Sequence, residues 1–182
     1  DGIDRILVLG CGKAGAAMAL VAEELLGELV SAGLVVVKDG HLAPTRRISI
    51  VEAGHPVPDA RGERAAARLL ELAAGAGRRD LVLFLVSGGG SALTPAPAPP
   101  VSLAEKQAVT RALLGAGAPI GELNAVRKHL SRFKGGQLAR AAEVVFVDLT
   151  GPREVAEHFE RPREPTTRLH LPVLVAELAE PR

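Results

Sequence analysis

A glycine-rich segment between two hydroxyl side chains is the first candidate for chemistry in this sequence. Ser87-Gly88-Gly89-Gly90-Ser91 follows an unbroken apolar run from Leu81 to Val86. Such a run is typical of a strand buried on both faces of a parallel sheet, and open α/β sheets bind ligands where such strands end. Glycines let the loop turn tightly and expose N–H groups that suit an anion, most simply a phosphate. A turn without a ligand is the alternative, and we favour the phosphate loop.

A second glycine pattern lies near the start of the chain. Gly10-Cys11-Gly12-Lys13-Ala14-Gly15 fits G-x-G-x-x-G and follows a predicted strand, Arg5–Leu9. This is the context that the motif requires. A helix is expected next, with Gly33 as its stop and a second strand at Leu34–Val37. Its apolar residues recur at helical spacing: Met18, Val21, Ala22, Leu25, Leu26 and Leu29.

Two residues beside this motif favour different chemistries. Asp39 lies near the end of the second strand, where a dinucleotide fold places the acid that binds ribose, which favours an oxidoreductase. Lys13 instead favours an anionic ligand. The start of a helix repels a cation, and a lysine there would neutralise phosphoryl or carboxylate oxygens.

The third candidate is a basic segment before Gly135 and Gly136. A helix is expected from Glu122 to Phe133, with Leu123, Val126, Leu130 and Phe133 as its apolar stripe. Polar and basic side chains flank the stripe: Asn124, Arg127, Lys128, His129, Ser131, Arg132 and Lys134. A solvated face is the default for such a cluster, and a lone histidine such as His129 is more often a surface or capping residue. The density of basic side chains nevertheless indicates an anion site.

Other classes of site find no support in the sequence. The five histidines are scattered and there is no C-x-x-C, so no residues are assigned to a metal. Neither a P-loop motif nor a G-x-S-x-G elbow is present. The net charge of +1 and the lack of Trp and Tyr argue against nucleic acid. Without an apolar run of about 18 residues, no membrane span is expected, and one cysteine fits a cytoplasmic protein.

The remaining segments complete an α/β pattern. A strand at Ile48–Val51 leads to a stiff loop, His55 to Asp59, in which Asp59 can cap a helix over Ala60–Ala74. A proline-rich connector, Thr94–Pro100, precedes a capping box at Ser102 and Glu105. With a last strand at Val144–Val147, the pattern predicts a Rossmann-like, doubly wound, mostly parallel sheet in a three-layer αβα fold. Residues 150–182, rich in Pro, Arg and Glu, are given no structure.

Four segments, taken together and in this order, resemble the N-terminal domain of the glycerate 2-kinase family, whose members are also labelled hydroxypyruvate reductase. The segments are GCGKAGAAMA, EAGHPVPDARG, LVLFLVSGGGSAL and SLAEKQAVTRALLGAGAPIGELNAVRKHLSRFKGGQLA, and they lie within residues 5–142. The resemblance implies ATP-dependent phosphorylation of D-glycerate to 2-phosphoglycerate with Mg²⁺. It implies glycerate and ATP as partners, and it leaves a homodimer open.

The resemblance also implies roles for individual residues. Lys13 matches the family's active-site lysine, and Ser87–Ala92 matches its phosphate loop. We assign Lys13 and Arg127 as catalytic residues, and His55, Asn124 and Lys134 as substrate-binding residues. The residues assigned to phosphate or nucleotide are Gly10, Gly12, Gly15, Ser87, Gly88, Gly89, Gly90 and Ser91.

The chain departs from the family pattern near its end. Val147-Asp148-Leu149-Thr150-Gly151-Pro152 keeps at most the first Asp and the Gly of the family's S-D-V-x-G-D segment. The expected organisation is therefore a kinase N-terminal domain over residues 1–149, an atypical tail over 150–182, and no second domain. We expect little kinase activity from the chain alone. Two alternatives stay open: an NAD(P)-dependent hydroxypyruvate reductase and a non-catalytic nucleotide-binding remnant.

Overall fold

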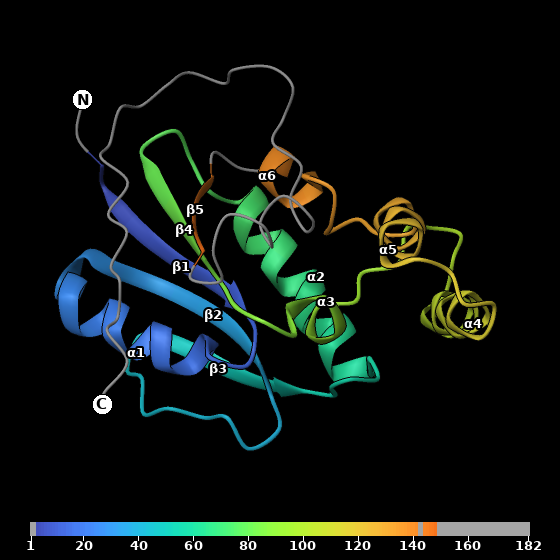
Figure 1. Ribbon diagram of the computed structural model, residues 1–182. Helices are drawn as coiled ribbons and strands as arrows, with labels where there is room; N and C mark the ends of the chain where they lie inside the picture. The colour runs from blue at the N-terminus through green and yellow to red at the C-terminus, as the bar shows by residue number, and fades with distance from the viewer. Residues whose placement is uncertain (1–2, 142–143, 149–182) are drawn as a thin grey trace.

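Five parallel strands form one sheet in the computed structural model, which describes residues 3–141 and 144–148 (Figure 1). The order is β3-β2-β1-β4-β5. The bounds are Arg5–Cys11 (β1), Val30–Lys38 (β2), Ile48–Ala53 (β3), Asp80–Val86 (β4) and Val144–Asp148 (β5). The sheet grows outward from β1 in both directions, as in a doubly wound fold, so the predicted α/β class is confirmed. The crevice at the carboxyl ends of β1 and β4 is the topological switch point, where such sheets bind ligands.

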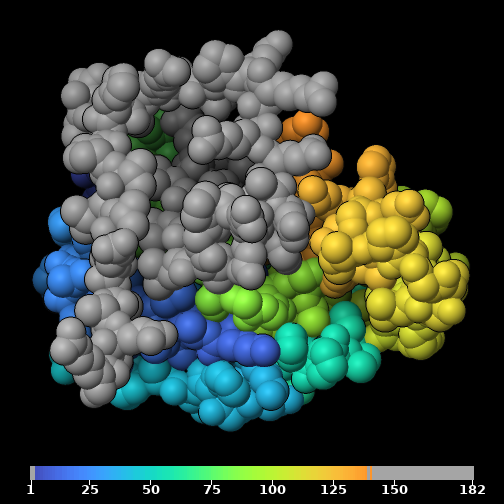
Figure 2. All heavy atoms as spheres, viewed as in Figure 1, coloured from blue at the N-terminus to red at the C-terminus, as the bar shows by residue number. Residues whose placement is uncertain are grey.

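Helices cover both faces of the sheet. The helix α1 (Gly15–Leu26), with a short 3₁₀ turn, η1 (Gly27–Leu29), lies on one face. The helices α2 (Ala60–Ala74) and α6 (Gln137–Ala141) lie on the other (Figure 1). The short α3 (Gly90–Leu93) follows β4, while α4 (Leu103–Gly115) and α5 (Ile120–His129) form a projection to one side, yellow in Figure 2.

The central strands are apolar on both sides because each side faces a helix layer. Along β1, Leu7 and Leu9 pack in the core beneath α2. The alternate residues Ile6 and Val8 pack in the core beneath α1. The prediction of strands buried on both faces is therefore confirmed at the centre of the sheet.

The predicted boundary between the first helix and the second strand was wrong. The helix α1 ends at Leu26, its C-cap Gly27 has a φ of +53°, and β2 already begins at Val30. Gly33 lies inside β2, where a Cβ atom would come within 2.4 Å of the carbonyl oxygen of Val8. Glycine is needed there for strand packing rather than for ending a helix. Part of the expected apolar stripe, Leu25 and Leu29, is exposed.

The helix predicted to reach Phe133 ends four residues earlier, at His129. The next residues pair with the proline-rich connector. The N–H of Arg132 donates to the carbonyl of Ala96 at 2.9 Å, and the N–H of Ala98 donates to that of Leu130 at 3.2 Å. Phe133 packs against Phe84, with 5.9 Å between ring centroids. These contacts turn the chain towards the sheet.

Local signals in the sequence were more reliable. The helix α2 has the predicted bounds, and the carboxylate of Asp59 accepts from the N–H of Gly62 at 2.9 Å. Ser102 and Glu105 form the predicted capping box of α4. Among the described residues, no helix is long and apolar enough to cross a membrane. The predicted boundary after residue 149 and the tail lie outside the described residues.

Candidate anion-binding site

Two loops meet at the switch point and are bonded to each other: residues 10–15 after β1, and residues 87–91 after β4. The N–H of Lys13 donates to the carbonyl of Gly88 at 2.9 Å, and that of Ala14 donates to Ser87 Oγ at 3.0 Å. The N–H of Ser87 donates back to the carbonyl of Cys11 at 3.1 Å. The two glycine loops are therefore in direct contact.

The glycines of the 10–15 loop allow close packing. A Cβ atom on Gly12 would lie 2.1 Å from Ser87 Oγ, and one on Gly10 would lie 2.7 Å from the carbonyl oxygen of Leu85. The N–H of Gly12 donates to the carbonyl of Val36, and that of Gly15 donates to Gly12. Since these groups already have partners, a phosphate role for Gly10, Gly12 and Gly15 stays a prediction.

The 87–91 loop has free donors. Within the described part of the chain, the N–H groups of Gly88, Gly89 and Ser91 donate to no protein acceptor. A Cβ atom on Gly88 would meet open space, so the backbone is accessible there. Gly89 has a φ of +93°, which turns the loop. Successive free N–H groups of this kind suit a phosphate.

Lys13 and His55 flank Gly89 from two other loops. A Cβ atom on Gly89 would lie 3.1 Å from His55 Nε2 and 3.3 Å from Lys13 Cγ. Burial, Lys13 and Lys38 lower the pKa of His55, so its neutral form is favoured. Lys13 is exposed and supplies the positive charge beside the free N–H groups.

Arg127 approaches the same loop from α5. Its Nη2 donates to Ser91 Oγ at 2.5 Å. Burial lowers the pKa of Arg127, which nevertheless stays charged at neutral pH. Asn124 is half-buried one helical turn before Arg127. Outside the site, His129 is exposed and bonds through Nδ1 to the carbonyl of Ala125 in its own helix at 2.8 Å, which fits the surface alternative.

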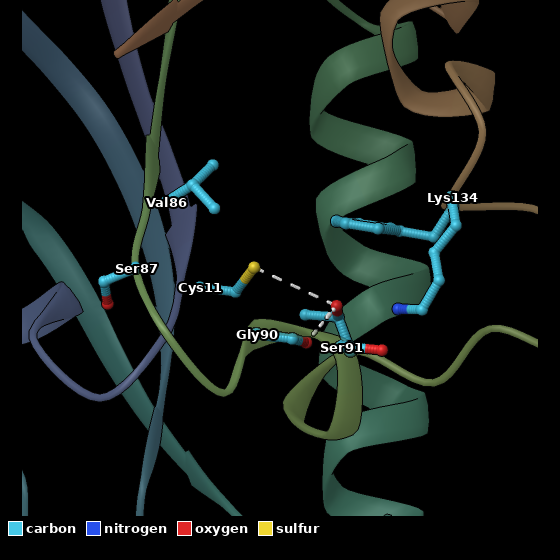
Figure 3. A pocket seen from close by; sticks show the side chains of 8 residues that line it. Cys11, Val86, Ser87, Gly90, Ser91 and Lys134 are labelled. Carbon is cyan, nitrogen blue, oxygen red and sulfur yellow. Dashed lines mark hydrogen bonds between the residues drawn. The ribbon is translucent and has the colours of Figure 1, made fainter. Parts of the chain in front are cut away.

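Lys134 is held between the connector and the sheet. Ser131 Oγ accepts from the N–H of Phe133 and from that of Lys134, each at 3.2 Å. The side chain is 8% exposed, and Figure 3 shows its amine directed towards Ser91. Burial lowers the pKa of Lys134 to about 7. Cys11 raises it, while Lys106 and Arg127 lower it further.

Sequence reasoning missed Lys106. Its Nζ donates to the carbonyl of Leu130 at 3.0 Å, which ties α4 to the segment leading to Lys134. Burial, followed by the charge of Arg127, lowers the pKa of Lys106 to about 8. In the sequence it follows a capping box and resembles any lysine on a solvated helix. Only the tertiary contact with Leu130 distinguishes it.

Cys11 and Thr94 were also missed. With Ser91, Phe133 and Lys134 they line a cavity of about 20 Å³ (Figure 3). Burial raises the pKa of Cys11 to about 11, although Lys134 and Thr94 oppose this rise. Thr94 Oγ1 donates to the carbonyl of Gly90 at 2.9 Å. The position of Cys11 between two glycines after a buried strand was a usable signal.

The charges of this site are unbalanced. Lys106, Arg127 and Lys134, hereafter the basic cluster, form no ion pair with any acid in the part of the chain described. The same part contains no group of three His, Cys, Asp or Glu side chains able to hold a metal. The charged side chains described at this site, Lys13, Arg127 and Lys134, are basic, so they fit an anion.

Asp39 is engaged elsewhere. Arg61 donates to its two carboxylate oxygens at 2.7 and 2.9 Å. This contact lowers the pKa of Asp39. The acid that would bind a ribose is therefore already paired, and the N–H groups of Gly12, Lys13, Ala14 and Gly15 all have protein acceptors. Neither the Asp39 carboxylate nor the N–H groups of the 10–15 loop are therefore available to bind a nicotinamide cofactor.

Known proteins resemble this chain over most of its length. D-glycerate 2-kinase of Thermotoga maritima is 45% identical over 158 residues, which cover 83% of this chain and 38% of that protein. A putative hydroxypyruvate reductase of Agrobacterium vitis is 46% identical over 160 residues, 84% of this chain and 42% of that one. The crystal structure of the Thermotoga maritima glycerate kinase matches with a TM-score of 0.80 at 44% identity, covering 86% of this chain and 39% of that one.

These relatives are longer proteins, of which the chain spans about two fifths. The family model that matches residues 1–149 is described as a domain of unknown function, DUF4147. The match includes both loops, the basic cluster and all five strands. The chain therefore belongs to the DUF4147 family.

Proposed function

We propose that this chain is the N-terminal part of a kinase that transfers a phosphoryl group from ATP to the 2-hydroxyl of D-glycerate. The observation that carries the proposal is the 87–91 loop, where N–H groups with no acceptor among the described residues lie beside Lys13 and Arg127. Phosphoryl transfer spreads negative charge over oxygen atoms, and its catalysis consists largely of positioning and charge stabilisation. The names of the relatives support the same reaction.

The residues then have distinct roles. The N–H groups of Gly88 and Gly89 bind phosphate oxygens of ATP, and Lys13 stabilises charge on the transferred group. Arg127, fixed by Ser91, does the same from the other side of the loop. His55, Asn124 and Lys134 bind the acceptor. ATP supplies the phosphoryl group.

Formation of 2-phosphoglycerate from ATP and D-glycerate tests this proposal. The assay uses the 182-residue chain and a chimera in which residues 1–149 replace the matching segment of the Thermotoga maritima enzyme. We expect activity in the chimera and a loss of about 100-fold or more in its Lys13→Ala variant. The control is Arg68→Ala, which removes an exposed charge of α2.

Two results would contradict parts of this proposal. Undiminished turnover in Lys13→Ala would remove Lys13 from the mechanism. Oxidation of NADH by hydroxypyruvate, without any ATP-dependent product, would overturn the kinase proposal in favour of the reductase.

A further inference from the structure

The basic cluster concentrates positive charge, and no acid in the described part of the chain forms an ion pair with it. Lys134 is 8% exposed and Lys106 is 6% exposed. The three charges are close enough that Lys106 and Arg127 both lower the pKa of Lys134. Burying like charges without an acid is costly. Such an arrangement is expected where an anionic ligand supplies the missing charge, as it does in many binding sites.

The size of the space beside Lys134 limits what that anion can be. The cavity of about 20 Å³ between Cys11, Thr94 and Lys134 has room for about one water-sized group. A nucleotide base or a triphosphate cannot enter it. A single oxygen of a small anion, such as a carboxylate, can enter it, and Lys134 and Ser91 line this cavity (Figure 3).

The cavity lies close to the free N–H groups. Lys13 and His55 flank Gly89, whereas Arg127 contacts Ser91, two residues further along the same loop. Two residues span no more than about 7 Å. This separation suits a short acid whose hydroxyl is on the carbon next to the carboxylate, because both groups then reach their positions at once.

We propose that Lys134, supported by Lys106, forms a carboxylate subsite beside Arg127, which holds the acid group of a 2-hydroxy acid while its hydroxyl faces the phosphate position at Gly88 and Gly89. The inference rests on the proposed kinase function and adds the recognition of the acceptor. Lys134 binds the carboxylate directly. Lys106 is a positioning residue, because its bond to Leu130 fixes the segment that carries Lys134. The subsite selects acids over polyols.

Ligand binding without ATP tests the subsite separately from catalysis. The 182-residue chain, labelled with ¹³C at lysine Cε, is titrated with D-glycerate, glycerol and inorganic phosphate. We expect D-glycerate to shift the Lys134 signal and raise its pKa, and glycerol to leave both unchanged. Lys134→Met should weaken D-glycerate binding by about tenfold or more, the effect of one charge-assisted hydrogen bond.

Two variants separate positioning from general damage. Lys106→Met should weaken D-glycerate binding and also broaden or shift the Lys134 signal in the free protein. Arg132→Met, which removes an exposed charge from the same segment, should do neither. Circular dichroism and melting curves check that each variant folds. If Lys106→Met does not fold, the titration of the wild-type chain still tests the subsite.

Three outcomes would overturn the inference. The first is unchanged D-glycerate affinity in Lys134→Met. The second is a Lys134 signal that responds to phosphate and not to D-glycerate, which would make the cluster a phosphate subsite. The third is no response to any of the ligands. Failure of the chimera to form 2-phosphoglycerate, with D-glycerate still binding at Lys134, would instead overturn the kinase function alone.

Discussion

Arg127 donates from Nη2 to Ser91 Oγ at 2.5 Å and thereby joins α5 to the loop that follows β4. The two residues are 36 positions apart in the chain. The bond uses the serine hydroxyl as an acceptor and leaves the N–H of Ser91 without a protein partner in the described residues. One residue of the loop therefore fixes a guanidinium with its side chain while its backbone can still bind an anion.

Replacing Ser91 by alanine should separate these two roles. Ser91→Ala keeps the backbone N–H but removes the acceptor of Arg127, so we expect a loss of about 1 kcal/mol of stability. We also expect weaker D-glycerate binding, because the guanidinium is no longer fixed. Chemical unfolding and isothermal titration measure the two effects. Ser49→Ala, an exposed serine of β3, is the control, and equal effects from both changes would contradict the role of Ser91.

Two glycines with similar backbone angles provide a matched pair. Gly89 has a φ of +93° and Gly40 a φ of +80°, so alanine at either position should cost about 1 kcal/mol in backbone strain. A Cβ atom on Gly40 meets nothing within 4 Å, whereas one on Gly89 lies 3.1 Å from the ring of His55. We expect only Gly89→Ala to weaken binding of a nucleotide phosphate, measured by equilibrium dialysis with ATP. Similar ATP affinities in the two variants would argue against a phosphate at Gly89.

Cys11 should be protected from alkylation in the folded protein. Burial raises its pKa to about 11, and the side chain is 2% exposed. Since only the thiolate reacts, the rate with iodoacetamide at pH 8 should be about 100-fold or more below that of an ordinary thiol. Mass spectrometry measures the rate, and the same chain unfolded in urea is the control. Fast labelling of the folded chain would mean that the cavity is open to the reagent.

The sequence predicted the fold better than it predicted the site. Apolar runs and capping residues gave the strands and the bounds of α2, because these signals are local. The end of α5 could not be predicted, since it depends on pairing of residues 130–132 with the distant proline-rich connector. The same contact buries Lys106 and Lys134, which look like ordinary polar residues in the sequence. Charge patterns predicted an anion site, but which cations converge there depends on tertiary packing.

Lys134→Met should stabilise the free protein while it removes anion binding. The folded pKa of Lys134 is about 7, below the usual 10.5, so from about pH 7 to pH 10.5 the unfolded chain binds the proton more tightly. The contribution of Lys134 to the free energy of unfolding therefore rises with pH across this window and is least favourable below pH 7, where the buried amine is charged. Methionine fills similar space without a charge, so it removes the cost of the buried amine. Stabilising substitutions at functional sites often act in this way.

Unfolding in urea at several pH values measures this effect. The difference between wild type and Lys134→Met isolates Lys134, because Lys106 and Arg127 are present in both proteins. We expect the variant to be more stable at pH 6 and its advantage to shrink as the pH rises to 10. Arg132→Met, which loses an exposed charge, should show no such trend. Saturating D-glycerate should narrow the difference in stability between the two proteins. Its carboxylate supplies the negative partner that the charged amine of Lys134 lacks in the free wild-type protein. A variant less stable than wild type at pH 6 would mean that Lys134 is already compensated in the free protein.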